Sequence, residues 1–435
     1  MAERKRDKLK RITASWSGRT LASGRVALEL GRAAASKALT SATEAVDARL
    51  GESLAQELDA MKGLAMKVGQ MASYLEGSLP PDAQQVLRRL QQGGESLPLD
   101  ALRPSIEASL GGSLEDLFDD VDEDALASAS IAQVHRATLH GEHVVIKVQY
   151  PEIARTLEVD LSALGRLGRI AGLGSAMDPG EVVGELRDRL QEECDFTVEA
   201  ANQERFRRRW ASEPWVTIPR VYPERSSGTV LTSSFERGRS FYDFVEASDE
   251  ATRARAAERL FVFSFRSIFQ HGCMHGDPHP GNYLFPEGED RTVFLDFGCV
   301  RWFEEDLVRA WKRLAWTMLE GRRADLPEAM AATGMVPDPD RYDFDHHWEV
   351  MRYLYEPFTA PRFRYTQDYV ARSWKLLGWD NPNLRRTRMP APWVLVQRLQ
   401  WGLNSVLALH DVEVDYGTLF RACLSGELHA EPPPQ

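Results

Sequence analysis

The alternation of apolar and polar residues changes its period several times along the chain, and these changes mark the expected elements. Residues 50–110 have apolar positions at helical spacing, and the two prolines in SLPPDAQQVLRRL predict a helix start. AQVHRATL and HVVIKVQY, residues 132–139 and 143–150, have the texture of strands and flank the turn HGE, which predicts a β-hairpin. Helices are expected again over residues 153–172 and 179–210.

The second half of the chain has a mostly helical pattern that contains short apolar runs. WVTIPRVY and TVLTSSF are strand-like, and from SFYDFVEA to about residue 424 the helical pattern is interrupted by NYLF and TVFLDF. Strands first, then helices with a small inserted hairpin, indicate an α+β protein with two lobes. We expect the following segments: a basic N-terminal segment (1–48), a helical extension (49–110), a first lobe (111–235), a second lobe (236–425) and a disordered tail (426–435).

Composition and charge are those of a globular protein without general affinity for nucleic acid. Of the 435 residues, 43% are hydrophobic and 27% are charged, so the chain is long and apolar enough to form the cores of two lobes. The net charge of -12 disfavours nucleic acid as a partner. Residues 1–40 differ from the rest, because ten lysines and arginines against three acidic residues give them a charge of +7.

The basic N-terminal segment has three interpretations that the sequence leaves open. Its arginines are interspersed with apolar residues such as Trp16 and Leu21, which is typical of a helix on an anionic membrane surface. A solvated helix and a targeting segment also fit its composition. The four cysteines show no CxxC spacing, and no apolar run approaches the roughly 18 residues of a membrane span. We expect a cytoplasmic location, with peripheral attachment to the inner face of a membrane as the alternative.

The fragment HGCMHGDPHPGNYLF, residues 271–285, gathers polar side chains directly before an apolar run. Asp277 and Asn282 are five residues apart, and two prolines between them prevent a continuous helix. Asp296 follows Asn282 by fourteen residues, at the end of a hairpin formed by NYLF and TVFLDF. This spacing resembles the catalytic loop of kinases followed by the DFG triplet.

These residue types suit the chemistry of a nucleoside triphosphate. The phosphates of ATP need a divalent cation, usually Mg²⁺, and a carboxylate from Asp296 and an amide oxygen from Asn282 are suitable ligands. Asp277 is placed to orient or deprotonate an acceptor hydroxyl or a water. The sequence therefore predicts a Mg-ATP site.

Two other interpretations of this fragment are weaker. His271, His275 and His279 recur every fourth residue, which on a helix would indicate zinc, but the prolines and glycines break the helix. An ordinary turn-rich loop is the second alternative, and the DFG triplet at the expected distance disfavours it.

A kinase-like site also needs a cation from the first lobe, and Lys147 in VVIKVQYP supplies it. A lysine among apolar strand residues is costly unless it is paired, so we expect Lys147 to bind the α/β-phosphates and to meet a helix glutamate. Glu193 and Glu199 are six residues apart, so they cannot share one helix face and should have different roles. No G-x-G-x-x-G precedes Lys147, and the alanines of ASASIAQVH predict a stiffer loop in that place.

Together these motifs resemble the AarF/UbiB family of atypical kinases over roughly residues 50–425. The most specific marker is MKVGQMAS, which matches the K-x-G-Q motif of the family through Lys67, Gly69 and Gln70. The other matches are the Ala-rich loop at Ala127, Ser128, Ala129 and Ser130 (Ser128 stands where the family has alanine), the E-x-D motif at Glu193 and Asp195, the helix glutamate at Glu199, and the nucleotide site at Lys147, Asp277, Asn282 and Asp296.

The resemblance implies a two-lobed, protein-kinase-like α+β fold that binds ATP and Mg²⁺ between its lobes. It also implies that the K-x-G-Q extension lies over the cleft as a regulatory element, with Lys67 and Gln70 contacting Glu193 and Asp195. The family is linked to ubiquinone biosynthesis, and its members act as ATPases or kinases on small or lipid-associated substrates rather than on proteins. A lipid or quinone precursor is therefore the implied partner besides the nucleotide.

The linker between the lobes is expected to contact the adenine side of the nucleotide through Ser233 and Phe235. Ser234 stands where the family commonly has an acidic residue. Two alternatives to the leading function stay open. A small-molecule kinase of the aminoglycoside or choline type has a loop similar to HGDPHPGN but lacks the K-x-G-Q extension. An ATP-gated scaffold would have the same nucleotide-binding residues, but it would hydrolyse ATP slowly or not at all.

Overall fold

The chain divides into two compact units in a computed structural model. The structure describes residues 96–129, 131–153, 194–377, 381–383, 386–387 and 391–427. The first unit comprises Met1–Thr138 and Ile146–Cys194, and the second comprises Leu139–Val145 and Asp195–Gln435. Each unit is considered by itself below.

Several sequence-based expectations lie outside the described residues. They concern the basic N-terminal segment with its proposed membrane surface, the K-x-G-Q residues Lys67, Gly69 and Gln70, the loop residue Ser130, Glu193, the helix expected over 153–172, and the tail from 428 onward. Within the described ranges, no helix combines the length and the hydropathy that crossing a membrane requires.

Two helices come first in the described part of the first unit, and local residues account for where they end or begin. Helix α6 (Leu99–Leu110) ends at Gly111, which adopts the left-handed conformation with a φ of 77°. Glycine is favoured there because it has no Cβ to clash with the backbone. Helix α7 (Leu114–Leu117) is capped by Ser113, whose side chain accepts a hydrogen bond from the backbone N–H of Asp116.

The sheet that follows contains the predicted hairpin. Strands β1 (Asp120–Ser128), β2 (Ala132–Leu139), β3 (Glu142–Gln149) and β5 (Val230–Ser234) are ordered β1-β2-β3-β5, and the residues of β5 belong to the second unit. The β2–β3 hairpin is confirmed, and the two residues of its turn, His140 and Gly141, both have positive φ, as a type I′ hairpin turn requires. Strand β1 is not predicted by the sequence, because its acidic residues leave it mostly exposed at the edge of the sheet and without apolar alternation.

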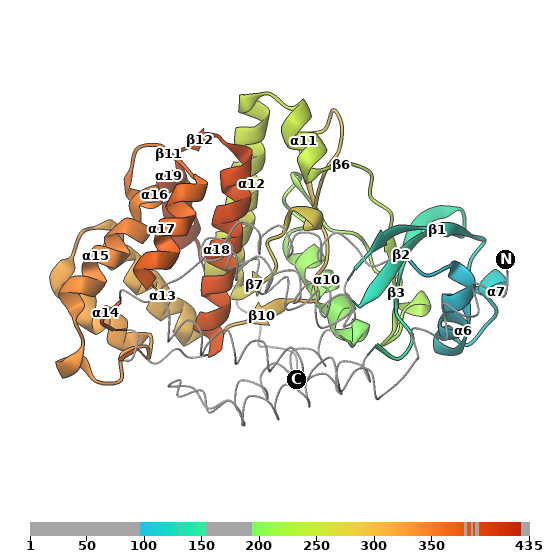
Figure 1. The fold of residues 1–435 in the computed structure, drawn as a ribbon, viewed down its shortest axis with the longest axis horizontal. Helices are drawn as coiled ribbons and strands as arrows, with labels where there is room; N and C mark the ends of the chain where they lie inside the picture. Colours follow the sequence, from blue (N-terminus) through green and yellow to red (C-terminus); the bar gives the residue numbers. More distant parts are fainter. Residues whose placement is uncertain are drawn as a thin grey trace, which may run out of the picture. The chain divides into compact units, whose positions relative to one another are not determined.

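The second unit is mainly helical and contains short strands (Figure 1). Its helices are α10 (Phe196–Arg209), α11 (Phe241–Ala247), α12 (Glu250–His271), α13 (Glu305–Leu319), α14 (Leu326–Ala332), α15 (Phe344–Leu354), α16 (Glu356–Thr359), α17 (Gln367–Leu377), α18 (Ala391–His410) and α19 (Tyr416–Ser425). Besides β5, its strands are β4 (Val216–Thr217), β6 (Arg239–Ser240), β7 (Cys273–His275), β8 (Tyr283–Phe285), β9 (Thr292–Phe294), β10 (Val300–Trp302), β11 (Phe363–Arg364) and β12 (Glu413–Val414). The predicted α+β class is confirmed.

The short strands of the second unit hold the loops that bear the candidate site. Strands β4, β9, β8 and β6 form one sheet in that order, and β8 and β9 are the predicted hairpin, with Tyr283 opposite Phe294. Strands β7 and β10, which the sequence does not predict, pair antiparallel. The run WVTIPRVY was expected to be a strand, but only its Val216–Thr217 part forms β4. Pro219 cannot donate to a ladder, which limits the strand.

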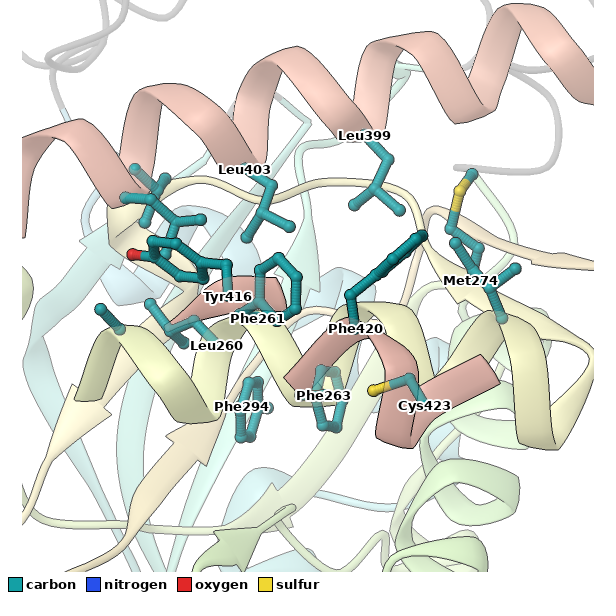
Figure 2. Packing of buried hydrophobic residues seen from close by; sticks show 14 of the residues in the cluster. Leu260, Phe261, Phe263, Met274, Phe294, Leu399, Leu403, Tyr416, Phe420 and Cys423 are labelled. Atoms are coloured by element: carbon teal, nitrogen blue, oxygen red, sulfur yellow. The ribbon is translucent and has the colours of Figure 1, made fainter. Parts of the chain in front are cut away.

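Helix α12 is the centre of the core in the second unit. Asp249 caps its start by accepting from the N–H of Thr252, and Gly272 ends it with a φ of 61°. Figure 2 shows Phe261 of α12 near Tyr416 of α19, with Leu399 and Leu403 of α18 on the same side. The rings of Phe261 and Tyr416 are 4.9 Å apart. Large buried aromatic rings dominate such a core. Because Gly272 turns the chain directly into β7, the loop that follows β7 starts from a rigid support.

Candidate functional site

The loop that follows β7 is packed against the segment that follows β9. Gly276 donates its N–H to the carbonyl of Cys299 at 2.6 Å. A Cβ at Gly276 would lie 2.8 Å from the same oxygen, closer than real side chains approach. Glycine is therefore required directly before Asp277, because the two segments touch through their backbones.

Asn282 is held by Asp277 in one orientation of its amide. Its Nδ2 donates both to the backbone carbonyl of Asp277 at 2.8 Å and to the carboxylate Oδ2 of Asp277 at 3.0 Å. Only the nitrogen of an amide can donate a hydrogen bond, so these two acceptors determine which side-chain atom of Asn282 is the nitrogen and which is the oxygen. The opposite end, Oδ1, accepts no hydrogen bond from the residues that the structure describes, so Asn282 presents an oxygen that suits a hard cation.

Asp296 is brought beside Asn282 by the β8–β9 hairpin. The pairing of Tyr283 with Phe294 continues one step further, where the N–H of Leu295 donates to the carbonyl of Asn282 at 2.9 Å. Asp296 follows immediately, and neighbouring antiparallel strands lie about 5 Å apart. The structure thus brings Asp277, Asn282 and Asp296 together in the second unit, and their roles stay predictions.

The backbone of Asp296 is held in an uncommon conformation. Its φ is 57°, in the left-handed region that aspartate tolerates better than most residues but that still costs ~1–2 kcal/mol. Its carboxylate Oδ1 accepts from the N–H of Gly298 at 3.1 Å, and its carbonyl accepts from Nε2 of His275 at 2.7 Å. Such strained residues concentrate at functional sites, where surrounding contacts maintain them.

His275 is a site residue that the sequence reasoning missed. Its position two residues before Asp277, as in the H-x-D of the kinase catalytic loop, was the available signal, but the spacing of the histidines pointed only to a zinc ligand. The structure instead buries the ring against Phe297, with a ring separation of 5.1 Å, and uses it to hold the carbonyl of Asp296. Because a carbonyl only accepts, Nε2 of His275 must carry the proton.

Helix α10 presents one face to the turn that contains Asp296. Glu199 is only 5% exposed, and its Oε2 lies 3.5 Å from the point where a Cβ of Gly298 would stand. Asn202 donates to the carbonyl of Phe297, and the ring of Phe206 lies 5.1 Å from that of Phe297. Positions 199, 202 and 206 follow the 3.6-residue period of a helix, which is the sequence signal for this face.

Asp195, expected as part of the E-x-D motif, is the N-cap of α10. Its Oδ1 accepts from the N–H of Thr197 at 2.9 Å and from the hydroxyl of Thr197 at 2.6 Å. These contacts satisfy one backbone donor of the first helical turn. The expected contact of Asp195 with the K-x-G-Q extension stays a prediction, because Lys67 and Gln70 lie outside the described residues.

Lys147, Ala127 and Ser128 of the predicted nucleotide site lie on the sheet β1-β2-β3-β5, and Ala129 directly follows β1. Lys147 is on β3 in the first unit, on the opposite face from the buried Ile146 and Val148. The expected pairing of Lys147 with Glu199 stays a prediction. At the end of β1, Ala127 and Ser128 pair with Val134 and Gln133 of β2, and the N–H of Ala129 donates to the carbonyl of Ala132 to begin the tight turn.

The linker residues Ser233 and Phe235 already take part in backbone pairing. Ser233 is buried and bridges Val221, and Phe235 donates its N–H to the carbonyl of His143 at 3.0 Å. A pocket of about 610 Å³ adjoins this linker, and none of Asp277, Asn282 and Asp296 lines it. Its lining residues are His143, Phe235, Glu236, Arg237, Gly238, Arg239, Pro286, Glu287, Glu289 and Arg291.

The connection from the DFG triplet to the next helix is short. Gly298 ends the triplet and α13 begins at Glu305, so six residues join them. Three of the six form β10, which pairs with β7, and Trp302 of β10 lies under the guanidinium of Arg205 at 3.9 Å. This connection is therefore anchored at several points along its length.

Comparisons with known proteins agree with this architecture. The sequence model described as the ABC1 atypical kinase-like domain matches residues 89–329. The chain is 28% identical over 304 residues to the atypical kinase COQ8, mitochondrial, of Saccharomyces cerevisiae, covering 68% of this chain and 60% of that protein. It is 36% identical over 261 residues to the probable protein kinase UbiB of Yersinia pestis, covering 58% of this chain and 48% of that protein. The chain thus spans about half to three-fifths of the length of these curated relatives.

A solved structure, described as the complex of Rv3197 with erythromycin from Mycobacterium tuberculosis, has a similar fold. The TM-score is 0.65 and the sequences are 27% identical, with 90% of this chain and 100% of that chain covered. The family match covers more than half of the chain, and the motifs expected from the sequence fall within or near it. The chain therefore belongs to the ABC1 atypical kinase-like family, the AarF/UbiB family that its motifs predict.

Proposed function

We propose that this chain binds ATP with Mg²⁺ and acts as an atypical phosphotransferase or ATPase. The observation that supports it most is the arrangement of the three predicted residues in the second unit. The Nδ2 of Asn282 donates to Asp277, so the oxygen end of this amide is the candidate cation ligand, and the N–H of Leu295, the residue before Asp296, donates to the carbonyl of Asn282. A carboxylate and an amide oxygen fit a hard divalent cation.

Asn282 and Asp296 would hold Mg²⁺, which when bound neutralises charge on the phosphate oxygens. Asp277 is half-buried, and the amide of Asn282 donates to its Oδ2 at 3.0 Å. This contact fixes the direction of the carboxylate before any substrate arrives, which is what positioning an acceptor hydroxyl or a water requires. Lys147 and the Ala-rich loop are proposed to bind the phosphates, and Glu199 is proposed to orient Lys147.

We further propose that the acceptor is a small or lipid-associated molecule, such as a quinone precursor, rather than a protein. The six-residue connection between Gly298 and α13 supports this, because an anchored segment of that length offers little extended backbone for a peptide to pair with. The names of the COQ8 and UbiB relatives, together with the family's link to ubiquinone biosynthesis, support the quinone pathway.

The test measures ADP release by the purified full chain in the presence of ATP and Mg²⁺. Asp296→Asn keeps the size of the side chain but removes the charge that a cation needs, so we expect turnover to fall at least ~100-fold. Asp290→Asn is the matched control, since Asp290 lies in the turn of the same hairpin, has a side chain that is 70% exposed, and pairs with Arg255 and Arg259. Equal turnover by Asp296→Asn and the wild type would refute the metal site.

The same assay separates the alternatives. Nucleotide binding by the wild type with no ADP release would favour an ATP-gated scaffold. ADP release that is stimulated by choline or an aminoglycoside would favour the small-molecule kinases. The quinone pathway is tested by quinone and lipid profiling of cells that lack the protein, complemented by the wild type or by Lys147→Ala. Restored quinone levels with both genes would contradict a role for the nucleotide site.

A further inference from the structure

The amide of Asn202 holds two points of the segment that follows Asp296. Asn202 is 4% exposed, and its Nδ2 donates to the carbonyl of Phe297 at 3.3 Å. Its Oδ1 accepts from the indole Nε1 of Trp302 at 3.2 Å. One side chain of α10 therefore joins the middle of the DFG triplet to β10, across 95 and 100 positions of sequence respectively.

The contacts around this amide hold both partners in place. The ring of Phe206 lies 5.1 Å from that of Phe297 and 6.1 Å from that of Trp302, so it packs against both residues that the amide joins. The guanidinium of Arg205 lies 3.9 Å from the centroid of the Trp302 ring, and that of Arg209 lies 4.9 Å from it. Cation–π contacts at these distances favour one placement of the indole. Trp302 is thus fixed to α10 by its N–H and by its ring.

Asp296 depends on such anchors because its backbone is in the left-handed region. Its own carbonyl is held by His275, and its carboxylate accepts from Gly298. The carbonyl one residue further, on Phe297, is held by Asn202. A strained residue keeps its conformation only while neighbouring contacts maintain it. Loss of the Asn202 contact would let the turn that bears Asp296 relax and would shift its carboxylate.

We propose that Asn202 is a positioning residue of the metal site, which ties the turn bearing Asp296 to the same face of α10 that carries Glu199. The inference rests on the proposed function in which Asp296 and Asn282 hold Mg²⁺. Asn202 touches neither the cation nor the nucleotide in this scheme. Its effect is to keep the carboxylate of Asp296 where the cation needs it, so its loss raises the Mg²⁺ concentration that nucleotide binding requires.

The key variant is Asn202→Asp, which keeps the shape of the side chain. An ionised aspartate accepts but does not donate, so the bond to the carbonyl of Phe297 is lost and two oxygens face each other. The matched control is Gln203→Glu. Gln203 is the next residue of α10, is also 4% exposed, and donates its Nε2 to the carbonyl of Pro219 at 2.8 Å, outside the DFG segment. Both variants therefore lose one buried amide donor from the same helix.

The experiment has two measurements on the full chain. The first is hydrogen exchange of the peptide covering residues 294–302 without nucleotide, which we expect to be faster in Asn202→Asp than in the wild type and in Gln203→Glu. The second is equilibrium binding of ADP titrated with Mg²⁺. We expect the midpoint for Mg²⁺ to rise about tenfold or more in Asn202→Asp, because a buried partner is left unsatisfied, and to stay within about twofold in Gln203→Glu.

A purely structural role would destabilise both variants alike without moving the Mg²⁺ midpoint of either. That result, or equal exchange rates over residues 294–302 in the two variants, would overturn the inference while leaving the proposed function intact. A wild-type chain that binds no ADP at any Mg²⁺ concentration would overturn the proposed function, and the inference with it. Trp302→Phe is expected to give a smaller rise of the midpoint, because it removes the indole N–H and keeps an aromatic ring beside Arg205.

Discussion

The contact between Gly402 and Pro278 links a helix of the second unit to the loop that contains Asp277. A Cβ at Gly402, within α18, would lie 2.6 Å from Cγ of Pro278 and 3.3 Å from its carbonyl oxygen. Carbon atoms in contact normally lie about 3.5–4.0 Å apart, so Gly402→Ala requires a displacement of roughly 1 Å. The proline ring is bonded into its own backbone and cannot rotate away, so the displacement passes to the neighbouring Asp277.

Two opposing effects set the size of the stability change in Gly402→Ala. Replacing glycine by alanine inside a helix stabilises by ~1 kcal/mol, whereas overpacking a well-packed site costs ~1–3 kcal/mol. We expect a net loss of ~0–2 kcal/mol in the free energy of unfolding, which leaves the chain folded. A misplacement of about 1 Å at a catalytic group can lower the rate up to ~100-fold, so we expect ADP release to fall ~10–100-fold.

Gly417→Ala is the matched control for this prediction. Gly417 lies in α19, and a Cβ there would stand 2.8 Å from the carbonyl of Phe358, in a part of the second unit without a predicted site residue. Denaturant unfolding should show a stability loss of similar size for the two variants. Turnover per folded molecule should fall only in Gly402→Ala. If both variants lose turnover equally, or if Gly402→Ala keeps wild-type turnover, the contact with Pro278 does not position Asp277.

Two further predictions concern stability. His410 is fully buried and its pKa is lowered to about 3, mainly by burial and then by Arg253, whereas in the unfolded chain it is about 6.5. The folded chain therefore favours the neutral form of His410. The free energy of unfolding decreases as pH falls below 6.5, by ~1.4 kcal/mol at pH 5.5. Urea unfolding at pH 7.5 and 5.5 should therefore show a smaller decrease in the free energy of unfolding for His410→Phe than for the wild type. The same decrease in both proteins would contradict this prediction. Asp195→Ala should lower the free energy of unfolding by ~1 kcal/mol through loss of the cap, while Asp195→Asn should retain it. A change in turnover by Asp195→Asn at unchanged stability would show a role beyond capping.

The sequence by itself determined the family and the α+β class, and it predicted the residues of the candidate site. Asp277, Asn282 and Asp296 lie within twenty positions of one another, and the hairpin between them is a local structure set by turn residues and strand pattern. Spacing of that kind can be read from a sequence because the contacts are short in chain distance. Strand β1 was not predicted, because an exposed, acidic edge strand has no alternation of apolar and polar residues that could indicate it.

Only the tertiary structure decided how the loop is supported. Asn202 contacts Phe297 across 95 positions, and Gly402 meets Pro278 across more than 120, so neither contact leaves a local pattern. The role of His275 also depended on the tertiary structure. Its residue type and position fitted both a metal ligand and a hydrogen-bond donor, and its contact with the carbonyl of Asp296 identifies it as a donor. Periodicity and turn chemistry report local conformation. The partners of a buried polar group are fixed by packing between distant segments.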